Sequence, residues 1–503
     1  MAQSTTSILP GIDHIVVLIL ENRSLDNVLG WLYDPNNAPP FDKVPSGQTF
    51  DGVSGKNLKN PWGQAQQVPV GSTTDTTNPC PDPGEVYADV YQQLYNLAPP
   101  TPPTPVPPEP PQPPPMTGFI NNYAAQPHIA NPPNIMNGFR PVTLPSLSQL
   151  AYEYIVCDRW FASVPSQTLT NRSFVHAGTA SGYVNNDLHH LPFFINDTQT
   201  IFNLLEAQGK SWRIYYGGHW FFCMSFLGQG QLERYMFDFG PRRIYPFQQF
   251  LDDAQNGHLP AYSFVEPNFM DSIIYGREND MHPDAAIKDI DFHPSDVRYG
   301  DELVRKVYQA LLSGPNQQWQ STLLVITFDE HGGCYDHVPP GRAVRPDNRV
   351  IPPGQAGYSG FLFDRYGVRV PAVLVSPRIQ QPHSVDHTVY DHTSIIRTIM
   401  DRFLNVQGNE LGNRVAAATP LNPALADPRG DVLDLSVPVM PDDKPTHDSP
   451  LTAFQSQMVR AAYLRLQQLG ASAALTEPAF TTTLQSESQL QRLAATLPKS
   501  KAP

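Results

Sequence analysis

Uninterrupted runs of apolar and β-branched residues recur along this chain, and several end abruptly in polar residues. The clearest is Leu323–Phe328, which is too short for a helix and is typical of a strand buried on both faces of a parallel sheet. Ile12–Leu20 has the same pattern. Shorter runs predict strands at residues 155–157, 261–265 and 368–376. Pro371 predicts that the last of these lies off centre or contains a bulge.

Helical periodicity is found between these runs. Asp296–Leu312 has apolar residues at helical spacing and is expected to lead straight into the strand at Leu323. Leu204–Tyr216 predicts a helix, a stop at Gly209 and a strand. Further helices are predicted at 85–97, at 146–154, from Ser173, at 391–404 with Asp391 as N-cap, at 450–470 and at 483–496. Strands alternating with helices predict an α/β fold with a mostly parallel central sheet and helices on both faces.

Two stretches interrupt this alternation. Residues 34–80 are rich in Gly, Pro, Asn and Asp and predict a long surface loop. Residues 99–115 read PPTPPTPVPPEPPQPPP, which predicts an extended polyproline II segment that cannot join a sheet. A single occurrence favours a proline-rich insertion over a ligand for a proline-recognition module. The simplest division is one domain at 1–410 that contains both stretches, with an irregular segment and terminal helices at 411–503 packed on it.

Charge and hydropathy narrow the classes of partner. The 33 basic and 47 acidic residues give a formal net charge of -14, and no basic run is present, so nucleic-acid binding is not expected. The longest apolar run, Ile15–Leu20, is far shorter than the roughly 20 residues that span a bilayer. No membrane span is expected.

The N-terminus and the cysteines say little about compartment. MAQSTTSILPG has no basic region followed by an apolar core, so no signal peptide is predicted. The sequence as it stands predicts a cytoplasmic protein, or an exported one if a leader has been removed. The four cysteines, Cys80, Cys157, Cys223 and Cys334, fit neither a zinc ribbon nor a dense disulfide framework. They permit one disulfide and fit reduced, buried thiols at least as well.

Acidic and amide side chains follow the two strongest strands directly. Glu21 and Asn22 come after one strand, and Asp329 and Glu330 come after the other, next to the turn at Gly332. Ligands of open α/β sheets bind at the carboxyl ends of strands. An all-oxygen set of this kind suits a hard divalent cation, with calcium, magnesium or manganese favoured and zinc also compatible. The alternative is that Glu21 and Asn22 cap a turn.

Hydroxyl groups and a histidine supply further candidate chemistry. The segment 164–173 carries Ser166, Thr168, Thr170 and Ser173 before a predicted helix, and residue patterns alone do not rank them. A metal can activate such a hydroxyl as a nucleophile, whereas ordinary N-capping also explains the cluster. His293 precedes a proline and could bind a phosphate oxygen or protonate a leaving group, or could simply be solvated.

Seven segments in order resemble the bacterial and fungal phosphoesterase family. They are ILENRSLDNVLGW, CPDPGEVY, MTGFINNY, CDRWFASVPSQTLTNRSFVHAGTASG, HPSDVRYGDELVRKVY, TFDEHGGCYDHVPP and YDHTSIIRTI, and they extend from Ile12 to Leu404. That family includes phosphatidylcholine-type phospholipases C and the AcpA-type acid phosphatase. The resemblance implies an alkaline-phosphatase-like fold and hydrolysis of a phosphate ester through a covalent phosphoenzyme.

The resemblance also implies roles for individual residues. Thr168 matches the nucleophile, although Thr170 stands where the phospholipase members have proline. It implies that the metal ligands are Glu21, Asn22, Asp329 and Glu330, with the Thr168 Oγ1 as a further ligand. His293 matches a phosphate contact and candidate general acid. Asn171, His331 and His337 are further candidates for phosphate or metal contacts, whereas Asp336, Asp386, His387, Asp391 and His392 are expected to bond loops around the site.

The length of the C-terminal part indicates which class of phosphate ester is the expected substrate. About a hundred residues follow Leu404, which resembles the acid-phosphatase type more than phospholipases with added β-domains. A broad phosphomonoesterase that forms a phosphothreonine intermediate is therefore the first hypothesis. A phospholipase C that cleaves phosphodiesters such as phosphatidylcholine is the alternative. The expected partner is a phosphate-ester small molecule or a phospholipid head group. A non-catalytic binding protein on the same fold is a second alternative, and its expected mark, loss of the nucleophile or ligands, is absent.

Overall fold

The strongest apolar runs of the sequence become neighbouring strands at the centre of one sheet. A computed structural model describes residues 8–63, 65–98, 112–186, 197–225, 230–235, 242–283, 294–351, 359–404, 406, 408–430, 432–441, 444–445, 451, 453–468, 470–471 and 483–496. Within these ranges the main sheet has the order β13 (Ser384–Asp386), β6 (Ile155–Cys157), β12 (Ala372–Val375), β11 (Thr322–Phe328), β1 (His14–Leu20), β10 (Tyr262–Val265), β8 (Trp212–Tyr216), β9 (Ile244–Pro246).

The central strands β1 and β11 are parallel and buried. Every residue of β11 is buried, and so is every residue of β1 except His14. The register pairs Leu20 with Phe328, so both strands end at the same edge of the sheet. A strand flanked by strands and covered on both faces needs apolar side chains pointing both ways, which explains the continuous runs in the sequence.

The sheet is mostly parallel, and the exception is β12. This strand is antiparallel to both β11 and β6. As predicted for the 368–376 run, β12 lies off the centre of the sheet, as the third of the eight strands that the described residues form, and it stands between two other strands. Pro371 does not interrupt the ladder because it immediately precedes the strand, a position where its missing N–H is tolerated.

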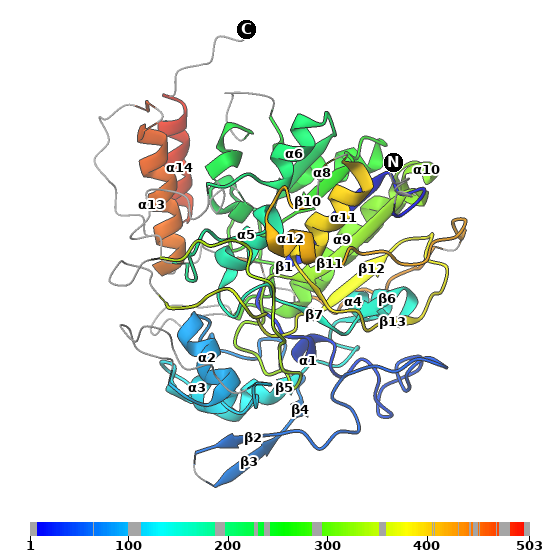
Figure 1. Cartoon of the computed structure of the whole chain (residues 1–503), viewed down its shortest axis with the longest axis vertical. Helices are drawn as coiled ribbons and strands as arrows, with labels where there is room; N and C mark the ends of the chain where they lie inside the picture. Colours follow the sequence, from blue (N-terminus) through cyan, green and yellow to red (C-terminus); the bar gives the residue numbers. More distant parts are fainter. Residues whose placement is uncertain are drawn as a thin grey trace.

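Helices cover both faces of the sheet, as the alternation of patterns predicts (Figure 1). The helices form two groups, and the helices within each group contact one another. One group contains α5 (Thr168–Ala177), α6 (Ile201–Ala207), α11 (Thr393–Phe403) and α12 (Asn413–Ala417). The other contains α4 (Pro145–Glu153), α8 (Phe247–Gln255), α9 (Val297–Ser313) and α10 (Asn316–Gln320). The short α10 separates α9 from β11, so the predicted direct connection is wrong.

Helices α5 and α11, which border the site, do not begin where the sequence pattern predicts. Helix α5 begins at Thr168 and not at Ser173, because its first turn is held by distant contacts such as the hydrogen bond from Leu169 N to Asn186 Oδ1 (2.9 Å). Helix α11 follows His392, and its N-cap makes no side-chain hydrogen bond. Asp391, the predicted N-cap, lies in β14 (Tyr390–Asp391), which pairs with β7 (Trp160–Phe161).

Smaller elements surround this framework. The predicted loop at 34–80 contains the hairpin of β2 (Lys59–Trp62) and β3 (Gln66–Pro69), which lies at the bottom of Figure 1. A satellite apolar cluster joins α2 (Tyr87–Tyr95) to α3 (Phe119–Ala125). The remaining elements are α1 (Leu25–Val28), β4 (Gly71–Ser72), β5 (Asn137–Gly138) and the 3-10 turns η1 (Pro132–Met136), η3 (Trp220–Phe222) and η4 (Gly230–Tyr235).

The terminal helices α13 (Ala453–Gln468) and α14 (Thr483–Ala494) lie side by side, as Figure 1 shows at the left of the view. Met458, Val459 and Tyr463 of α13 belong to the same apolar core as β1. All four cysteines are free thiols. The proline-rich stretch lies mostly outside the described residues, which resume at Gln112, so the insertion stays a prediction.

Candidate active site

The site is built where β1 and β11 end side by side. Asp329 N donates to Leu20 O at 3.1 Å, which continues the ladder by one residue and places the acidic residues after each strand at one edge. Asn22 N then donates to Asp329 Oδ1 at 3.2 Å. The two strand ends, more than three hundred residues apart in the chain, are therefore joined directly by hydrogen bonds, one of them between two residues that the sequence predicts to share a site.

Asn22 connects three separate segments. Its backbone is left-handed, with φ of 57°, a conformation that Asn adopts more readily than most residues. Its Nδ2 donates to Glu85 Oε1 at 2.6 Å, and its Oδ1 accepts from Thr168 Oγ1 at 3.4 Å. Left-handed backbone at a buried polar site is typical of functional positions, where surrounding contacts enforce the conformation.

Thr168 is the first residue of α5 and is only 3% exposed. Its hydroxyl faces Asn22 from the N-terminal end of the helix, where the helix dipole favours negative charge. The neighbouring Thr170 is fully buried, and its Oγ1 has no hydrogen-bond partner in the described part of the chain. Of these two threonines, Thr168 alone is hydrogen-bonded to a residue of the predicted ligand set.

Arg172 lies one helical turn after Thr168 and balances part of the acidic charge. Its guanidinium contacts Glu21 at 3.2 Å, Asp329 at 3.3 Å and Glu266 at 3.5 Å, all with buried side chains. Glu266 follows β10 directly, just as Glu21 follows β1. Arg172 thus joins the ends of three adjacent parallel strands to α5.

Glu330 and His331 complete the turn after β11. Glu330 Oε2 accepts from Gly332 N at 2.8 Å, whereas Oε1 has no hydrogen-bond partner among the described residues. His331 Nε2 contacts Gln93 Oε1 at 2.8 Å, and its Nδ1 lies 3.2 Å from Glu330 Oε2. Burial lowers the pKa of His331 to about 3, which favours the neutral imidazole, and a neutral ring can donate to only one of these two oxygens at a time.

Negative charge exceeds positive charge in this buried region. Burial raises the pKa of Glu21 and of Glu330 well above the ordinary value, and the nearby carboxylate of Asp329 raises both further. Burial also raises the pKa of Glu85. These buried carboxyl groups are costly to ionise without a nearby positive charge, and Glu330 Oε1 has no hydrogen-bond partner among the described residues. Both features fit a bound divalent cation. Glu21, Asn22, Asp329, Glu330 and the Thr168 hydroxyl are the groups that would hold it.

The structure adds residues to the site that the sequence patterns did not single out. Asp82, Glu85 and His282 can bring one ligand atom each within 4.8 Å of one another. His282 Nε2 lies 3.7 Å from Glu85 Oε1, and Glu21 N donates to Asp280 O at 2.8 Å. Burial lowers the pKa of His282, but the surrounding carboxylates outweigh burial and hold its pKa well above the ordinary value.

Signals for these additional residues were present but weak. Glu85 lies in the CPDPGEVY segment, and His282 precedes a proline as His293 does. Glu266 follows a predicted strand, the same position that pointed to Glu21 and Asp329. None could be assigned from local pattern, because their convergence depends on how distant loops fold over the strand ends. His293 itself lies outside the described residues, so its role stays a prediction.

The comparisons with known proteins agree with this geometry. The Phosphoesterase family model matches residues 12–406. Non-specific phospholipase C6 of Arabidopsis thaliana is 34% identical over 463 residues, covering 89% of this chain and 79% of the relative. The chain belongs to the phosphoesterase family. Phospholipase C B of Mycobacterium tuberculosis strain H37Rv is 28% identical over 426 residues, covering 78% and 74%.

Among solved structures, an alkaline phosphatase superfamily protein from Vibrio parahaemolyticus aligns with a TM-score of 0.32 and 14% identity. The alignment covers 56% of this chain and 65% of that one. Family membership, with phospholipase C relatives, makes this phosphoesterase a hydrolase that acts on phosphoric ester bonds. The structure also contains side-chain groups that could hold a metal.

The phosphoesterase uses Asn171 to shape a loop. The Asn171 amide accepts from Val164 N at 3.0 Å and donates to Ser166 O at 2.8 Å and to Val164 O at 3.2 Å. With its side chain occupied in this way, Asn171 holds the segment before α5 and so positions Thr168. The phosphate contact expected of Asn171 stays a prediction beside this supporting role.

His337 likewise belongs to a network beside the site. Its Nδ1 contacts Asp26 Oδ2 at 2.7 Å, and its Nε2 contacts Asp51 Oδ1 at 3.1 Å. The buried Arg369 bonds Asp336 at 3.0 Å and Asp26 at 2.9 Å. Asp26, Asp336 and His337 could in principle hold a cation, but the Arg369 guanidinium already supplies the positive charge there.

The other residues expected to bond loops around the site make such bonds. His392 Nε2 donates to Asp329 O at 2.5 Å, which braces the turn after β11. Asp391 accepts from Ser163 Oγ at 2.9 Å and pairs with Arg414 at 3.2 Å. Asp386 accepts from Tyr390 at 2.9 Å, and His387 contacts Asp158 at 2.8 Å.

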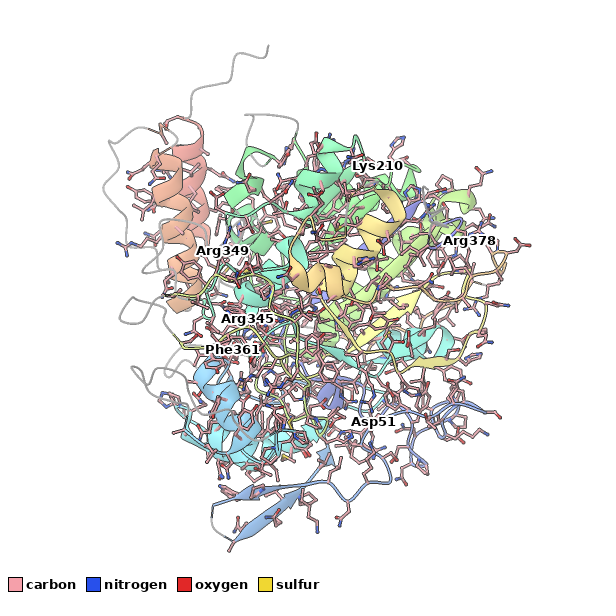
Figure 2. The ribbon with its side chains drawn as sticks, viewed as in Figure 1. Asp51, Lys210, Arg345, Arg349, Phe361 and Arg378 are labelled. Atoms are coloured by element: carbon pink, nitrogen blue, oxygen red, sulfur yellow. The ribbon has the colours of Figure 1, made fainter. Side chains whose placement is uncertain are left out.

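The described segments 341–351 and 359–365 contact the regions around α5 and α2. Phe361 packs on Tyr87 of α2 with ring centroids 5.0 Å apart, and Arg349 donates to Ser181 after α5 at 3.0 Å. Figure 2 shows Arg345, Arg349 and Phe361 in these segments. One of these segments therefore contacts the chain just after the helix that carries Thr168, and the other contacts α2, which follows Glu85.

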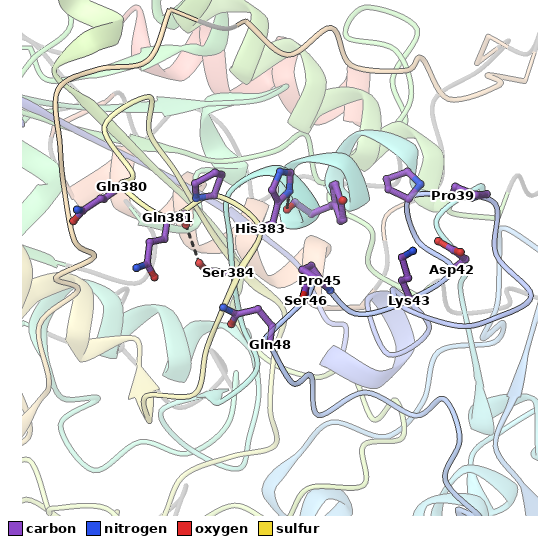
Figure 3. A pocket seen from close by; sticks show the side chains of 13 residues that line it. Pro39, Asp42, Lys43, Pro45, Ser46, Gln48, Gln380, Gln381, His383 and Ser384 are labelled. Atoms are coloured by element: carbon purple, nitrogen blue, oxygen red, sulfur yellow. Dashed lines mark hydrogen bonds between the residues drawn. The ribbon is translucent and has the colours of Figure 1, made fainter.

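A cavity of about 800 Å³ lies elsewhere, where the loop at 39–48 meets residues 380–384 and Tyr152 (Figure 3). His383 contacts Tyr152 O at 2.9 Å in its wall. Ser384, at its rim, begins β13, the strand at the opposite end of the sheet from β9. None of the candidate catalytic or metal-binding residues lines it, so the cavity is separate from the chemistry at β1 and β11.

Proposed function

We propose that this phosphoesterase is a metal-dependent phospholipase C that cleaves the head-group phosphodiester of lipids such as phosphatidylcholine. The observation that carries the proposal is the match to a phospholipase C over 89% of this chain. A match of that extent must continue past Leu404 into the C-terminal part. The shortness of that part therefore no longer favours the acid-phosphatase hypothesis.

The described side chains support a division of labour. Asn22 orients the Thr168 hydroxyl through the 3.4 Å contact, and Asn171 holds the loop that precedes it. Arg172 keeps the carboxylates of Glu21 and Asp329 in place. A divalent cation held by these groups, with calcium, magnesium or manganese favoured, would lower the pKa of the hydroxyl and offset charge on the phosphate.

In the proposed reaction Thr168 Oγ1 attacks phosphorus in line with the leaving alcohol and releases its proton to solvent. A bond forms between Oγ1 and phosphorus, and the ester bond to the lipid alcohol breaks. The leaving oxygen takes a proton from an imidazole, for which His293 and His282 are the candidates. Water then attacks the phosphothreonine, and the bond between phosphorus and Thr168 breaks.

Two chromogenic substrates test the proposal. We expect the purified protein, supplied with Mn²⁺, Mg²⁺ or Ca²⁺, to release nitrophenol from nitrophenyl phosphorylcholine at least tenfold faster than from nitrophenyl phosphate. The Thr168→Ala variant, purified identically, gives the background from contaminating phosphatases. A preference for the monoester would favour the phosphomonoesterase hypothesis, and equal background-level rates with both would favour a binding protein.

A further inference from the structure

An apolar turn projects from the rim of the active site. Ile273, Ile274 and Tyr275 are 50%, 54% and 45% exposed. They are the one run of three consecutive large apolar residues that is exposed within the described part of the chain. Exposed apolar patches beside a site commonly mark an interaction surface. We call residues 271–277 the apolar turn.

The base of the apolar turn is rigid. Ser272 and Gly276 exchange two backbone hydrogen bonds of 2.9 and 2.7 Å, and Ser272 Oγ accepts from Ile274 N at 3.1 Å. Asp271 forms an ion pair with Arg277 across the base. The side chains at the tip are thus held outward by a closed ring of bonds, so their exposure does not come from a loose loop.

Both ends of the segment that carries the turn are anchored on active-site residues. Before the turn, the Phe269 ring lies 5.3 Å from the guanidinium of Arg172. After it, Asp280 O accepts from Glu21 N at 2.8 Å. Tyr275 is five positions before Asp280, so its Cα lies within roughly 18 Å of the Asp280 Cα.

The terminal helices support the turn from the side. Tyr275 donates from its hydroxyl to Glu487 of α14 at 3.5 Å, and its ring lies 4.4 Å from that of His219. Gln455 of α13 donates to Phe269 O at 3.3 Å. Tyr275 therefore has its hydroxyl in a polar contact while its ring remains partly exposed, an arrangement typical of residues at a membrane surface.

We infer that the apolar turn docks the enzyme on a phospholipid surface by inserting Ile273 and Ile274 among the lipids, next to the site that receives the head group. The inference rests on the proposed phospholipase C function. Asp271 and Arg277 at the base pair with each other, and the acidic Glu278 and Glu487 lie beside the turn, so an anionic surface is disfavoured and a zwitterionic one such as phosphatidylcholine is suited. Burial of apolar surface, and not attraction to anionic lipid, supplies the affinity.

The experiment measures vesicle binding separately from catalysis. In a Thr168→Ala background, which prevents hydrolysis, the full chain is sedimented with phosphatidylcholine vesicles. We expect Ile273→Ser/Ile274→Ser to weaken the apparent affinity at least fivefold. Val389→Ser is the matched control, because Val389 is 45% exposed and follows β13 at the far end of the sheet. It should stay within twofold of its parent.

A second measurement keeps the two proposals distinguishable. With Thr168 present, the double variant should hydrolyse soluble nitrophenyl phosphorylcholine at the parental rate, which shows that it is folded, and should lose at least fivefold on vesicles. The single variant Ile274→Ser serves if the double variant is unstable. Parental hydrolysis of the soluble diester with vesicle binding unaffected by the serines would overturn this inference and leave the proposed function standing.

Two other outcomes are informative. The protein could bind vesicles through Ile273 and Ile274 and yet fail to hydrolyse the soluble diester. That result would support the docking surface and overturn the proposed function. A change in elution volume on size exclusion, without a change in vesicle binding, would show that a second copy of the chain covers the turn and would overturn the lipid assignment.

Discussion

At the scale of single residues, the side chains of the site are held in place by hydrogen bonds and ion pairs with one another. Asn22 contacts Asp329, Glu85 and Thr168, and Arg172 contacts Glu21, Asp329 and Glu266. Each of these groups is buried, so each polar atom that lost its partner would be left without water to replace it. Thr168 is the exception, because its hydroxyl makes one long hydrogen bond.

Thr168→Ala is therefore expected to abolish turnover while leaving the fold intact. The loss in kcat should be on the order of a thousandfold or more, because no other group replaces an activated hydroxyl. The change in the free energy of unfolding should be within about 1 kcal/mol, since only the 3.4 Å bond to Asn22 is lost. Steady-state kinetics and urea unfolding check both values.

Thr168→Ser is the matched control for this prediction. It retains a hydroxyl at the same atom and should keep measurable turnover of the preferred substrate. Undiminished activity in the alanine variant would exclude Thr168 as the nucleophile, and Ser166 or Ser173 would then be tested in its place.

At the scale of elements, the turns after β1 and β11 are packed against each other. Gly332 has a φ of 58°, and a Cβ at this position would lie 2.0 Å from Asn22 O. Because Gly332 has no side chain, the turn after β11 can approach the backbone of Asn22, the residue that is hydrogen-bonded to Glu85 and Thr168. This close approach is what brings Glu21 and Asn22 next to Asp329 and Glu330.

Gly332→Ala should consequently damage both stability and activity. The clash is with backbone and the conformation is left-handed, so we expect a loss of about 3 kcal/mol in the free energy of unfolding and loss of turnover. Gly341→Ala is the control, because a Cβ there meets nothing within 4 Å. Equal behaviour of the two variants in chemical denaturation would contradict the packing described.

His337 joins the same two turns from the side of Asp26 and Asp51. Burial lowers its pKa, but hydrogen bonds to both carboxylates outweigh burial and raise it to about 9. Lys56 Nζ lies 2.7 Å from His337 Nε2 and an Arg369 nitrogen lies 3.4 Å from Nδ1. Both cations repel the protonated ring, yet Asp26, Asp51 and Asp336 outnumber them. The imidazole is therefore charged at neutral pH and contributes to stability in that form.

The sign of the pH dependence follows from the raised pKa. The stabilisation by His337 is fully present below the unfolded pKa of about 6.5 and is lost as the pH rises through about 9. Compared with His337→Gln, the parent should be more stable by roughly 2 kcal/mol at pH 6 and by much less at pH 10. Urea unfolding of both proteins across this range checks the trend, and a constant difference would contradict it.

At the scale of the whole molecule, one sheet edge gathers charge from segments spread along the chain. None of the helices that the structure describes is both long and apolar enough to cross a bilayer. The apolar core extends from β1 to the terminal helices, so the C-terminal part contributes to the structure that surrounds the site. The accumulated buried carboxylates make the stability of the molecule dependent on a counter-charge.

Metal removal should thus lower the melting temperature, and the size of the effect should depend on Glu330. For the parent, a saturating divalent cation at about a hundred times its Kd should add roughly 2.7 kcal/mol of stability. Glu330→Gln should stabilise the metal-free protein or leave it unchanged, because it removes a buried charge, and should shrink the gain from metal.

Glu410→Gln is the control for the metal prediction, since it removes the same charge from an exposed position. It should melt like the parent with and without metal. Differential scanning calorimetry with chelator and with added Mn²⁺, Mg²⁺ or Ca²⁺ supplies the values. A metal-dependent gain that is unchanged in Glu330→Gln would exclude Glu330 from the ligand set.

Much of the fold was predictable because its strongest signals are local. The runs that became β1 and β11 must be buried on both faces, and this requirement is written in consecutive residues. The acidic residues after each run pointed to a shared edge, and the structure places Asn22 and Asp329 in direct contact. The orientation of β12 and the start of α5 were not predictable, because they are set by partners distant in sequence.

The sequence by itself determined which strands occupy the centre and that acidic and amide side chains follow their ends, because strand burial and strand-end position depend on neighbouring residues. Only the tertiary structure decided which further groups join them. Glu85, Glu266, Arg172 and His282 meet at this edge because long connections fold over it, and no local pattern records that meeting. The apolar turn owes its place beside the site to the same folding of distant segments.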